Sequence, residues 1–363
     1  MRLFAGLILG GVLAVHGVAR AEAPVETSLG KLQLTTMATG LTEPWGLAFL
    51  PDGSFLITER EGRLLRFSGS GGAVAAVQGV PEVYAEGQGG LLDVMIPRDF
   101  AQTRHVFLTY ARPVAGGGVT TLGRGTLSAD GTGLTGFTVL FSDPVPDPSG
   151  RHFGSRVVEA ADGSLFVTSG ERGSADLAQD PALAKGKVIH LSREGSPLTA
   201  INGALGGVHS MGHRNPQGAA VDGAGQLWVV EHGAQGGDEL NRVEAGSNYG
   251  WPVISFGKDY DDSKIGVGTE AEGMEQPVHY WDPSIAPSGL MIHSGRMFPE
   301  WQGDVFTGSL KFDYVSRLDP DDGYAEERIE GPETGRVRDV REGPDGAIWF
   351  LSVGNGAVYR MSR

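Results

Sequence analysis

The sequence has no cysteine among its 363 residues. This absence excludes disulfide bonds, thiolate-bound metal ions and haem attached through a Cys-x-x-Cys-His motif. A protein without disulfides must be held together by its hydrophobic core, by a closed topology or by bound metal. Since 40% of the residues are hydrophobic, the chain can bury a sizeable core.

Basic residues are also few, with 29 Lys and Arg against 44 Asp and Glu, for a formal net charge of −15. Nucleic acid and anionic membrane surfaces would repel this charge, so neither is expected as a partner. Calcium ions and neutral substrates are compatible with it.

Long apolar runs are missing after the first residues. Arg2 is followed by the apolar stretch Leu3 to Val18 and by small residues around Ala21 and Ala23, which predicts a signal peptide over residues 1–21 with cleavage near 21–23. The alternative is an uncleaved membrane anchor, but the stretch is short and glycine-rich for a membrane span. We therefore expect an exported, periplasmic protein without stable membrane insertion.

Long amphipathic helices are scarce as well, whereas 58 glycines are spread along the chain. Six similar strand-turn-strand outlines begin near residues 46, 92, 155, 217, 288 and 339. Four of them carry a hairpin turn at an Asp-Gly pair: Asp52-Gly53, Asp162-Gly163, Asp222-Gly223 and Asp345-Gly346.

Each interval between these outlines holds enough chain for a four-stranded sheet. The pattern predicts an all-β, six-bladed β-propeller over residues 31–363, built as a single catalytic domain. The segment from Lys31 to Leu41 has no hairpin partner nearby in the sequence, so we expect it to complete the last blade and close the ring. A β-sandwich or two separate sheet domains are the alternative.

Loops on one face of a propeller surround a central channel, so polar residues at matching places in the repeats should converge. Those residues are Gln88, His152, Glu171-Arg172, His213-Arg214-Asn215, Asp238-Glu239, Lys311, Arg336 and Arg338.

The chemistry of these residues suggests an anionic ligand and a general base. His152 has a side chain suited to proton transfer near neutral pH, although any one of nine histidines is more often structural. Arg214, Lys311, Arg336 and Arg338 would together hold a ligand with several carboxylates, although each could instead pair with one of the 44 acidic residues.

Two acidic residues could bind calcium. Asp238 and Glu239 follow Gly236-Gly237, and glycine turns leave carbonyl oxygens free for calcium. A solvated turn is the alternative. The acidic run from Asp259 to Asp262 lacks the glycine and the terminal glutamate of an EF-hand.

Several motifs together resemble the soluble, pyrroloquinoline quinone (PQQ)-dependent glucose/sorbosone dehydrogenases, and most of all the bacterial aldose sugar dehydrogenases. The similarity covers Leu32 to the C-terminus, and the family fold is a six-bladed propeller. The motifs are His152-Phe-Gly-Ser-Arg156, Gly212-His-Arg-Asn-Pro-Gln-Gly218, Glu231-His-Gly233, Gly237-Asp-Glu239, Asn248-Tyr-Gly-Trp-Pro252 and Arg336-Val-Arg-Asp339.

The resemblance implies oxidation of aldose sugars at the anomeric carbon to lactones. It makes His152 the general base, Glu171 the carboxylate that orients it, and Arg214 the group that stabilises the quinone oxygen. Electrons would pass to an external acceptor, either a quinone or a separate redox protein, and the protein would be a monomer or a homodimer. Residues implied to hold PQQ are Gln88, Arg214, Asn215, Tyr260, Lys311, Arg336 and Arg338.

The resemblance also implies two calcium ions. One would bind the main-chain oxygens of Gly233 and Ala234 next to the quinone, where it would act as a Lewis acid. The second would bind Glu239 and the carbonyl of Tyr249 as a structural ion.

Three positions depart from the family pattern. Glu171 stands where other branches have aspartate, which leaves the reach of this side chain to His152 open. Ala234 replaces a common proline, a change that a backbone ligand tolerates. The stretch from Val353 to Ala357 is richer in glycine than in the family.

Two other functions remain open from the sequence. A metal-dependent lactonase would need carboxylates around a metal in the channel, and a non-catalytic propeller would bind sugars or proteins. We interpret His213 and His232 as structural.

Overall fold

The computed structural model describes residues 19–72 and 75–363. The predicted signal peptide therefore lies outside the described residues except for its last three, 19–21. Over the described ranges, no helix combines the length and apolar character needed to cross a membrane.

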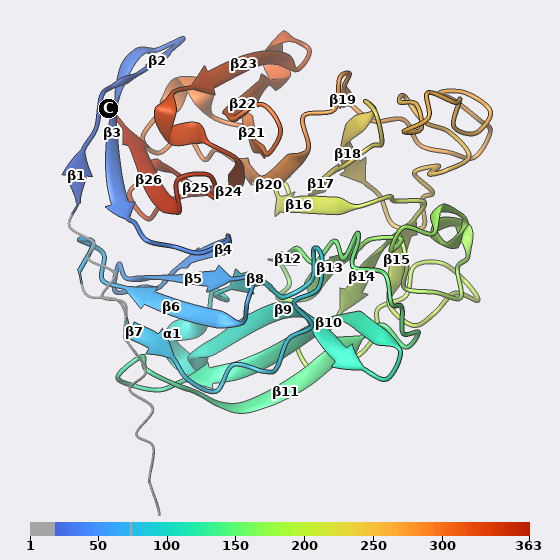
Figure 1. Ribbon diagram of the computed structural model, residues 1–363, viewed down its shortest axis with the longest axis horizontal. Helices are drawn as coiled ribbons and strands as arrows, with labels where there is room; N and C mark the ends of the chain where they lie inside the picture. The colour runs from blue at the N-terminus through green and yellow to red at the C-terminus, as the bar shows by residue number, and fades with distance from the viewer. Residues whose placement is uncertain (1–18, 73–74) are drawn as a thin grey trace, which may run out of the picture.

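Six antiparallel sheets are arranged around a common centre (Figure 1). The first strands of the sheets begin at residues 44, 91, 157, 216, 287 and 337, close to the six predicted starts. The predicted six-bladed propeller with four-stranded blades is therefore confirmed.

The blades are numbered I to VI along the chain. Blade I contains β4 (Pro44–Phe49), β5 (Phe55–Glu59), β6 (Arg63–Phe67) and β7 (Ala75–Val77); blade II, β8 (Leu91–Met95), β9 (His105–Val114), β10 (Gly117–Leu127) and β11 (Leu134–Ser142); blade III, β12 (Val157–Glu159), β13 (Leu165–Ser169), β14 (Lys187–Leu191) and β15 (Val208–Met211). Blade IV contains β16 (Pro216–Val221), β17 (Leu227–Glu231), β18 (Asp238–Val243) and β19 (His279–Trp281); blade V, β20 (Pro287–Ile292), β21 (Val305–Ser309), β22 (Tyr314–Asp319) and β23 (Ala325–Glu330); blade VI, β24 (Val337–Glu342), β25 (Ile348–Ser352), β26 (Ala357–Ser362) and β3 (Gly30–Ala38). Short helices are α1 (Phe100–Thr103) and the 3-10 turns Ala175–Gln179, Pro299–Trp301, Pro320–Asp322 and Pro332–Thr334.

The N-terminal strand closes the ring as predicted, because β3 pairs with β26 in blade VI. The expectation that this segment has no hairpin partner is wrong. β2 (Val25–Thr27) forms a tight hairpin with β3, and β1 (Arg20–Ala21) also pairs with β3. Cleavage near residues 21–23 would remove β1 and leave the closing pair β3–β26 in place.

Three of the four predicted turns have their glycine in the left-handed conformation, with φ of +81° at Gly53, +86° at Gly163 and +83° at Gly346. In blade IV the left-handed residue is Gly225, with φ of +86°, and not Gly223. The Asp222 N–H donates to the Gln226 carbonyl at 3.0 Å, so Asp222 begins this turn instead of lying inside it.

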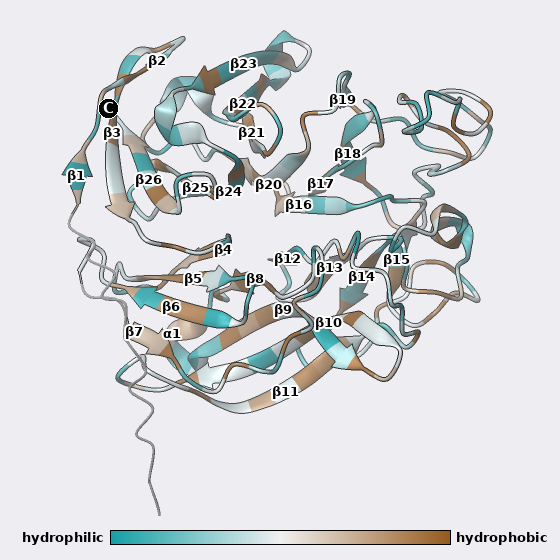
Figure 2. Ribbon diagram, in the orientation of Figure 1, coloured by the Kyte–Doolittle hydropathy of each residue, from teal (hydrophilic) through white to brown (hydrophobic). Residues whose placement is uncertain are grey.

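Hydrophobic side chains fill the space between neighbouring blades. Separate clusters of buried residues lie at the I/II, II/III, III/IV, IV/V, V/VI and VI/I junctions. Figure 2 shows hydrophobic residues along strands such as β9. Burial of these faces is the main favourable contribution to folding.

Buried ion pairs connect the inner strands near the centre of the ring. Arg156 Nη1 lies 2.8 Å from Asp93 Oδ1 and 3.2 Å from Asp339 Oδ1. Arg341 reaches the same two carboxylates, with 3.0 Å to each. Arg156, Asp93 and Asp339 are fully buried. Because two positive charges face two negative charges, attraction within the cluster offsets part of the cost of burying them.

This ionic cluster joins four blades. Asp93 belongs to β8 of blade II, Arg156 precedes β12 of blade III, and Asp339 and Arg341 belong to β24 of blade VI. The backbone N–H of Leu47, in blade I, donates to Asp339 at 3.0 Å. The cluster therefore holds the inner strands at fixed distances.

Replacement of Asp93 tests this role. Asp93→Ala leaves Arg156 and Arg341 with one carboxylate between them, and breaking a buried ion pair costs about 3–5 kcal/mol. We expect a loss of that size in the free energy of unfolding, measured with urea. The control is Lys31→Ala in the exposed pair with Glu26 (3.3 Å), for which the loss should stay under about 1 kcal/mol. Equal small losses for both variants would refute the structural role of the cluster.

Candidate active site

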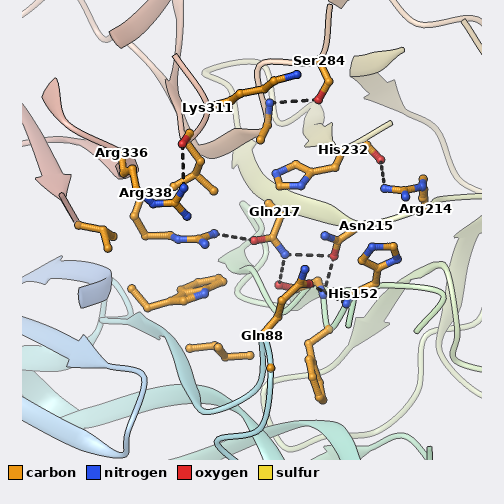
Figure 3. A pocket seen from close by; sticks show the side chains of 18 of the residues that line it. Gln88, His152, Arg214, Asn215, Gln217, His232, Ser284, Lys311, Arg336 and Arg338 are labelled. Carbon is orange, nitrogen blue, oxygen red and sulfur yellow. Dashed lines mark hydrogen bonds between the residues drawn. The ribbon is translucent and has the colours of Figure 1, made fainter. Parts of the chain in front are cut away.

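A cavity of about 610 Å³ opens at the centre of the ring (Figure 3). It brings together many of the residues that the sequence singled out, although they lie far apart in the chain. Those that line it are Gln88, His152, Arg214, Asn215, Gly233, Ala234, Tyr260, Lys311, Arg336 and Arg338. Glu171, Glu239 and Tyr249 lie outside its lining.

Irregular inner strands aim several side chains at this cavity. The strand register shifts between Pro44 and Gly46, between Pro216 and Gly218, and between Val337 and Asp339. The residues at these bulges are Trp45, Gln217 and Arg338, and all three line the cavity. A bulge redirects the side chain of its extra residue, so three blades each contribute one lining side chain in this way.

His152 is held at the cavity wall by contacts to its backbone and its ring. Its backbone N–H donates to Gln88 Oε1 at 2.8 Å. Its ring Nδ1 lies 2.7 Å from Glu171 Oε2. The glutamate therefore reaches the imidazole despite the departure from aspartate. With Nδ1 used in this contact, Nε2 is the ring nitrogen available for chemistry.

The cavity is strongly basic. Arg338 donates to Gln217 Oε1 at 2.7 Å. Burial, together with the nearby cations Arg156 and Arg336, lowers the pKa of Arg338 to about 9. Among the described residues that line the cavity, the one carboxylate belongs to Glu43, which pairs with Arg60. An anionic ligand would relieve the repulsion among the remaining cations.

Arg214 is fixed at its backbone and its side chain. Its N–H donates to Glu231 Oε2 at 2.6 Å, and its Nη1 donates to the His232 carbonyl at 3.3 Å. Its Nη2 lies 3.5 Å from the Tyr260 hydroxyl, and its Cζ lies 5.1 Å from the centre of the Trp251 ring. The buried Nε has no partner within the described part of the chain.

Side-chain amides connect the two halves of the site. Asn215 Oδ1 accepts from the Gly154 N–H at 3.2 Å and from Gln217 Nε2 at 3.1 Å. Gln217 then accepts from Arg338. Sequence reasoning missed Gln217, although it lies inside the quoted motif Gly212–Gly218.

His232, which the sequence interpretation made structural, lines the cavity. Its Nε2 lies 2.9 Å from the Pro287 carbonyl, and burial with the nearby Arg338 and Arg214 lowers its pKa to about 3. The imidazole is therefore neutral. His213 is buried away from the cavity, with Nδ1 2.7 Å from Glu231 and Nε2 2.9 Å from Ser210.

The two acidic candidates for calcium differ. Asp238 is buried and accepts from the N–H groups of Gly233 (2.7 Å), Ile285 (2.7 Å) and Ala286 (2.8 Å) and from the Ser284 hydroxyl. These donors occupy both of its oxygens, an arrangement that favours a structural role over metal binding.

Glu239 lies opposite Glu231 on the neighbouring strand. Burial, followed by repulsion from Glu231, raises the pKa of Glu239 to about 8. The buried Asn241 Oδ1 close by lacks a partner among the described residues. A cation beside Glu239 would satisfy these oxygens.

A metal at either predicted position would depend on main-chain oxygens. Residues 19–72 and 75–363 hold no group of three or more His, Cys, Asp or Glu arranged to bind a metal ion. Gly233 and Ala234 line the cavity and can offer only carbonyl oxygens, and Tyr249 is buried with its ring stacked on His213 at 4.7 Å.

Comparisons with known proteins agree with this architecture. The sequence model of the family described as Glucose / Sorbosone dehydrogenase matches residues 41–360. Aldose sugar dehydrogenase YliI from Escherichia coli K12 is 40% identical over 324 residues, which cover 86% of this chain and 87% of that protein.

Solved structures show the same similarity. The apo-form of the soluble aldose sugar dehydrogenase from Escherichia coli superposes with a TM-score of 0.86 at 38% identity, covering 91% of this chain and 99% of that one. The PQQ-bound form of aldose sugar dehydrogenase from Streptomyces coelicolor gives 0.77 at 26% identity, covering 95% and 99%. The chain belongs to the glucose/sorbosone dehydrogenase family.

Proposed function

We propose that this protein is a PQQ- and calcium-dependent aldose dehydrogenase that oxidises sugars at the anomeric carbon to lactones. The observation that carries the proposal is a single cavity in which His152, bound to Glu171, lies beside a cluster of cations. Among the described residues that line this cavity, the one carboxylate, Glu43, is already paired with Arg60. Family membership supports a sugar substrate, and the PQQ-bound relative supports the cofactor.

The basic lining fits a cofactor with three carboxylates. Lys311, Arg336 and Arg338 would bind the carboxylates, and Gln88, Asn215 and Tyr260 would provide further contacts. Within the described residues, the Arg336 side chain donates one hydrogen bond, to the Leu310 carbonyl at 3.1 Å. A bound PQQ would supply the acceptor for a hydride, which is two electrons together with the hydrogen of the anomeric carbon.

His152 would accept the proton of the anomeric hydroxyl at Nε2. Glu171 holds Nδ1 at 2.7 Å, which fixes the ring orientation and stabilises the positive charge that the imidazole gains. Arg214 would place its guanidinium against the negative charge that develops in the cavity, and a preorganised cation of this kind lowers the barrier.

Calcium would complete the site in two places. The carbonyl oxygens of Gly233 and Ala234 would bind one ion at the cavity wall. Glu239 and the carbonyl of Tyr249 would bind a second, whose charge would offset the repulsion between Glu231 and Glu239.

Two further expectations belong to this proposal. The signal peptide would direct the protein to the periplasm, where electrons would leave through a separate acceptor. A lactonase function is less consistent with the site, because a hydrolytic metal centre would need free carboxylates and Glu43 is paired with Arg60.

Reconstitution tests the function directly. Purified protein supplied with PQQ and calcium should reduce an artificial dye in the presence of glucose, and chelation of calcium should abolish the turnover. Dye reduction is followed by absorbance. Absence of turnover with every aldose tested, together with absence of cofactor binding, would refute the proposal. Lactone hydrolysis without PQQ would favour the lactonase.

The role of His152 is tested by His152→Gln. Loss of the general base should lower kcat by about 10²–10⁴-fold, with PQQ affinity nearly unchanged because the cations bind the cofactor. Steady-state kinetics and a PQQ titration measure the two effects. His105 does not line the cavity, so His105→Gln is the control and should keep its kcat. If His152→Gln retained full turnover, another group would be the base.

A further inference from the structure

Beside Glu171 lies a second residue whose side chain is directed at the segment that carries His152. Arg172 is 1% exposed and has a left-handed backbone with φ of +66°. Its guanidinium does not line the cavity, so it contacts neither sugar nor cofactor directly. The contacts of this side chain determine what it does.

The guanidinium of Arg172 donates to three backbone carbonyls. Nε donates to Arg151 at 2.7 Å, Nη1 donates to Gly118 at 2.8 Å, and Nη2 donates to Ser149. Its Cζ also lies 3.5 Å from the centre of the Phe153 ring. Contacts on both sides of His152, at residues 149, 151 and 153, therefore come from one side chain.

One of these contacts belongs to a rigid element. Gly118 lies in β10 of blade II, within a strand pair that extends from Gly117 to Thr126. The other two carbonyls belong to the segment 149–153, which has no regular secondary structure. The guanidinium is planar and its donors have fixed directions. Arg172 therefore holds the segment 149–153 at a fixed position relative to β10.

His152 needs such support. Its backbone is left-handed with φ of +50°, a conformation that costs a non-glycine residue free energy. Glu171, the residue before Arg172, fixes the His152 ring, because its Oε2 contacts Nδ1. Glu171 thus orients the imidazole, while Arg172 holds the backbone from which it projects.

We propose that Arg172 is a positioning residue for the general base of the dehydrogenase, acting through the backbone of residues 149–153. This rests on the proposed function, in which His152 accepts the sugar proton. Displacement of a reacting group by about 1 Å can lower a rate by about 100-fold. The position of His152 Nε2 is therefore the quantity that Arg172 controls.

The test compares Arg172→Met with a matched variant, Arg317→Met, in the reconstituted holoenzyme. Arg317 is also a buried guanidinium, with its Cζ 5.2 Å from the Trp301 ring and with Asp304 and Glu327 as partners in blade V. It does not line the cavity. Loss of stability should therefore affect both variants, whereas loss of positioning should affect only Arg172→Met.

For Arg172→Met we expect kcat per bound PQQ to fall by about 10–100-fold with PQQ affinity unchanged. The isotope effect on kcat with glucose deuterated at the anomeric carbon should rise, because the chemical steps become slower. Arg317→Met should keep both values. Arg172→Lys should recover part of the rate, because an ammonium group still donates to carbonyl oxygens.

Hydrogen exchange of the segment 149–153 gives a readout that needs no turnover. Exchange there should accelerate in Arg172→Met and stay unchanged in Arg317→Met. Unaltered exchange, or an Arg172→Met enzyme with full kcat per bound PQQ, would overturn the proposal. If kcat of Arg172→Met fell while its isotope effect stayed equal to that of Arg317→Met, Arg172 would have a purely structural role, which would also overturn the proposal. If the unmodified protein oxidised no sugar, the proposed function would be wrong. Hydrogen exchange of residues 149–153 would still test whether Arg172 holds this backbone.

Discussion

The buried ion pairs at the centre of the ring are the constraint on which the rest of the structure depends. Asp93, Arg156, Asp339 and Arg341 connect inner strands from different blades. The same cluster supports the cavity, because Arg156 Nε donates to the Gln217 carbonyl at 3.1 Å and its Cζ lies 4.4 Å from the centre of the Trp45 ring. The four charged residues therefore contact both the inner strands of the blades and residues of the cavity wall. Hydrophobic packing between the blades supplies the bulk of the stability, and the ion pairs fix the geometry.

The cavity differs from this cluster in its balance of charge. Arg156 and Arg341 in the cluster have carboxylate partners. In contrast, Lys311, Arg336 and Arg338 line a cavity whose one carboxylate, among the described lining residues, is already paired with Arg60. Cations gathered in one cavity repel one another, and a bound anion would relieve this repulsion. Burial lowers the pKa of Arg338, and repulsion from Arg156 and Arg336 lowers it further. The site therefore favours an anionic ligand, and the His152–Glu171 pair beside it adds a group able to move a proton.

The repeats predicted the fold from the sequence because Asp-Gly turns and alternating strands are local signals. The convergence of His152, Arg214 and Arg338 followed from the ring topology. Other features depend on contacts that no local pattern contains. The bulges at Trp45 and Gln217 interrupt the strand alternation, so their inward direction could not be foreseen. Likewise, Asp238 had the composition of a metal ligand, but four donors from its own blade and the next occupy it.

The central claim is that the basic cavity binds PQQ and that a sugar reduces it there. The most direct measurement is the absorption spectrum of the protein reconstituted with PQQ and calcium, recorded without oxygen or dye before and after addition of glucose. We expect one PQQ bound per chain and a spectral change to the reduced cofactor within a single turnover. A bound cofactor whose spectrum does not respond to any aldose, or a protein that leaves PQQ free in solution, would contradict it.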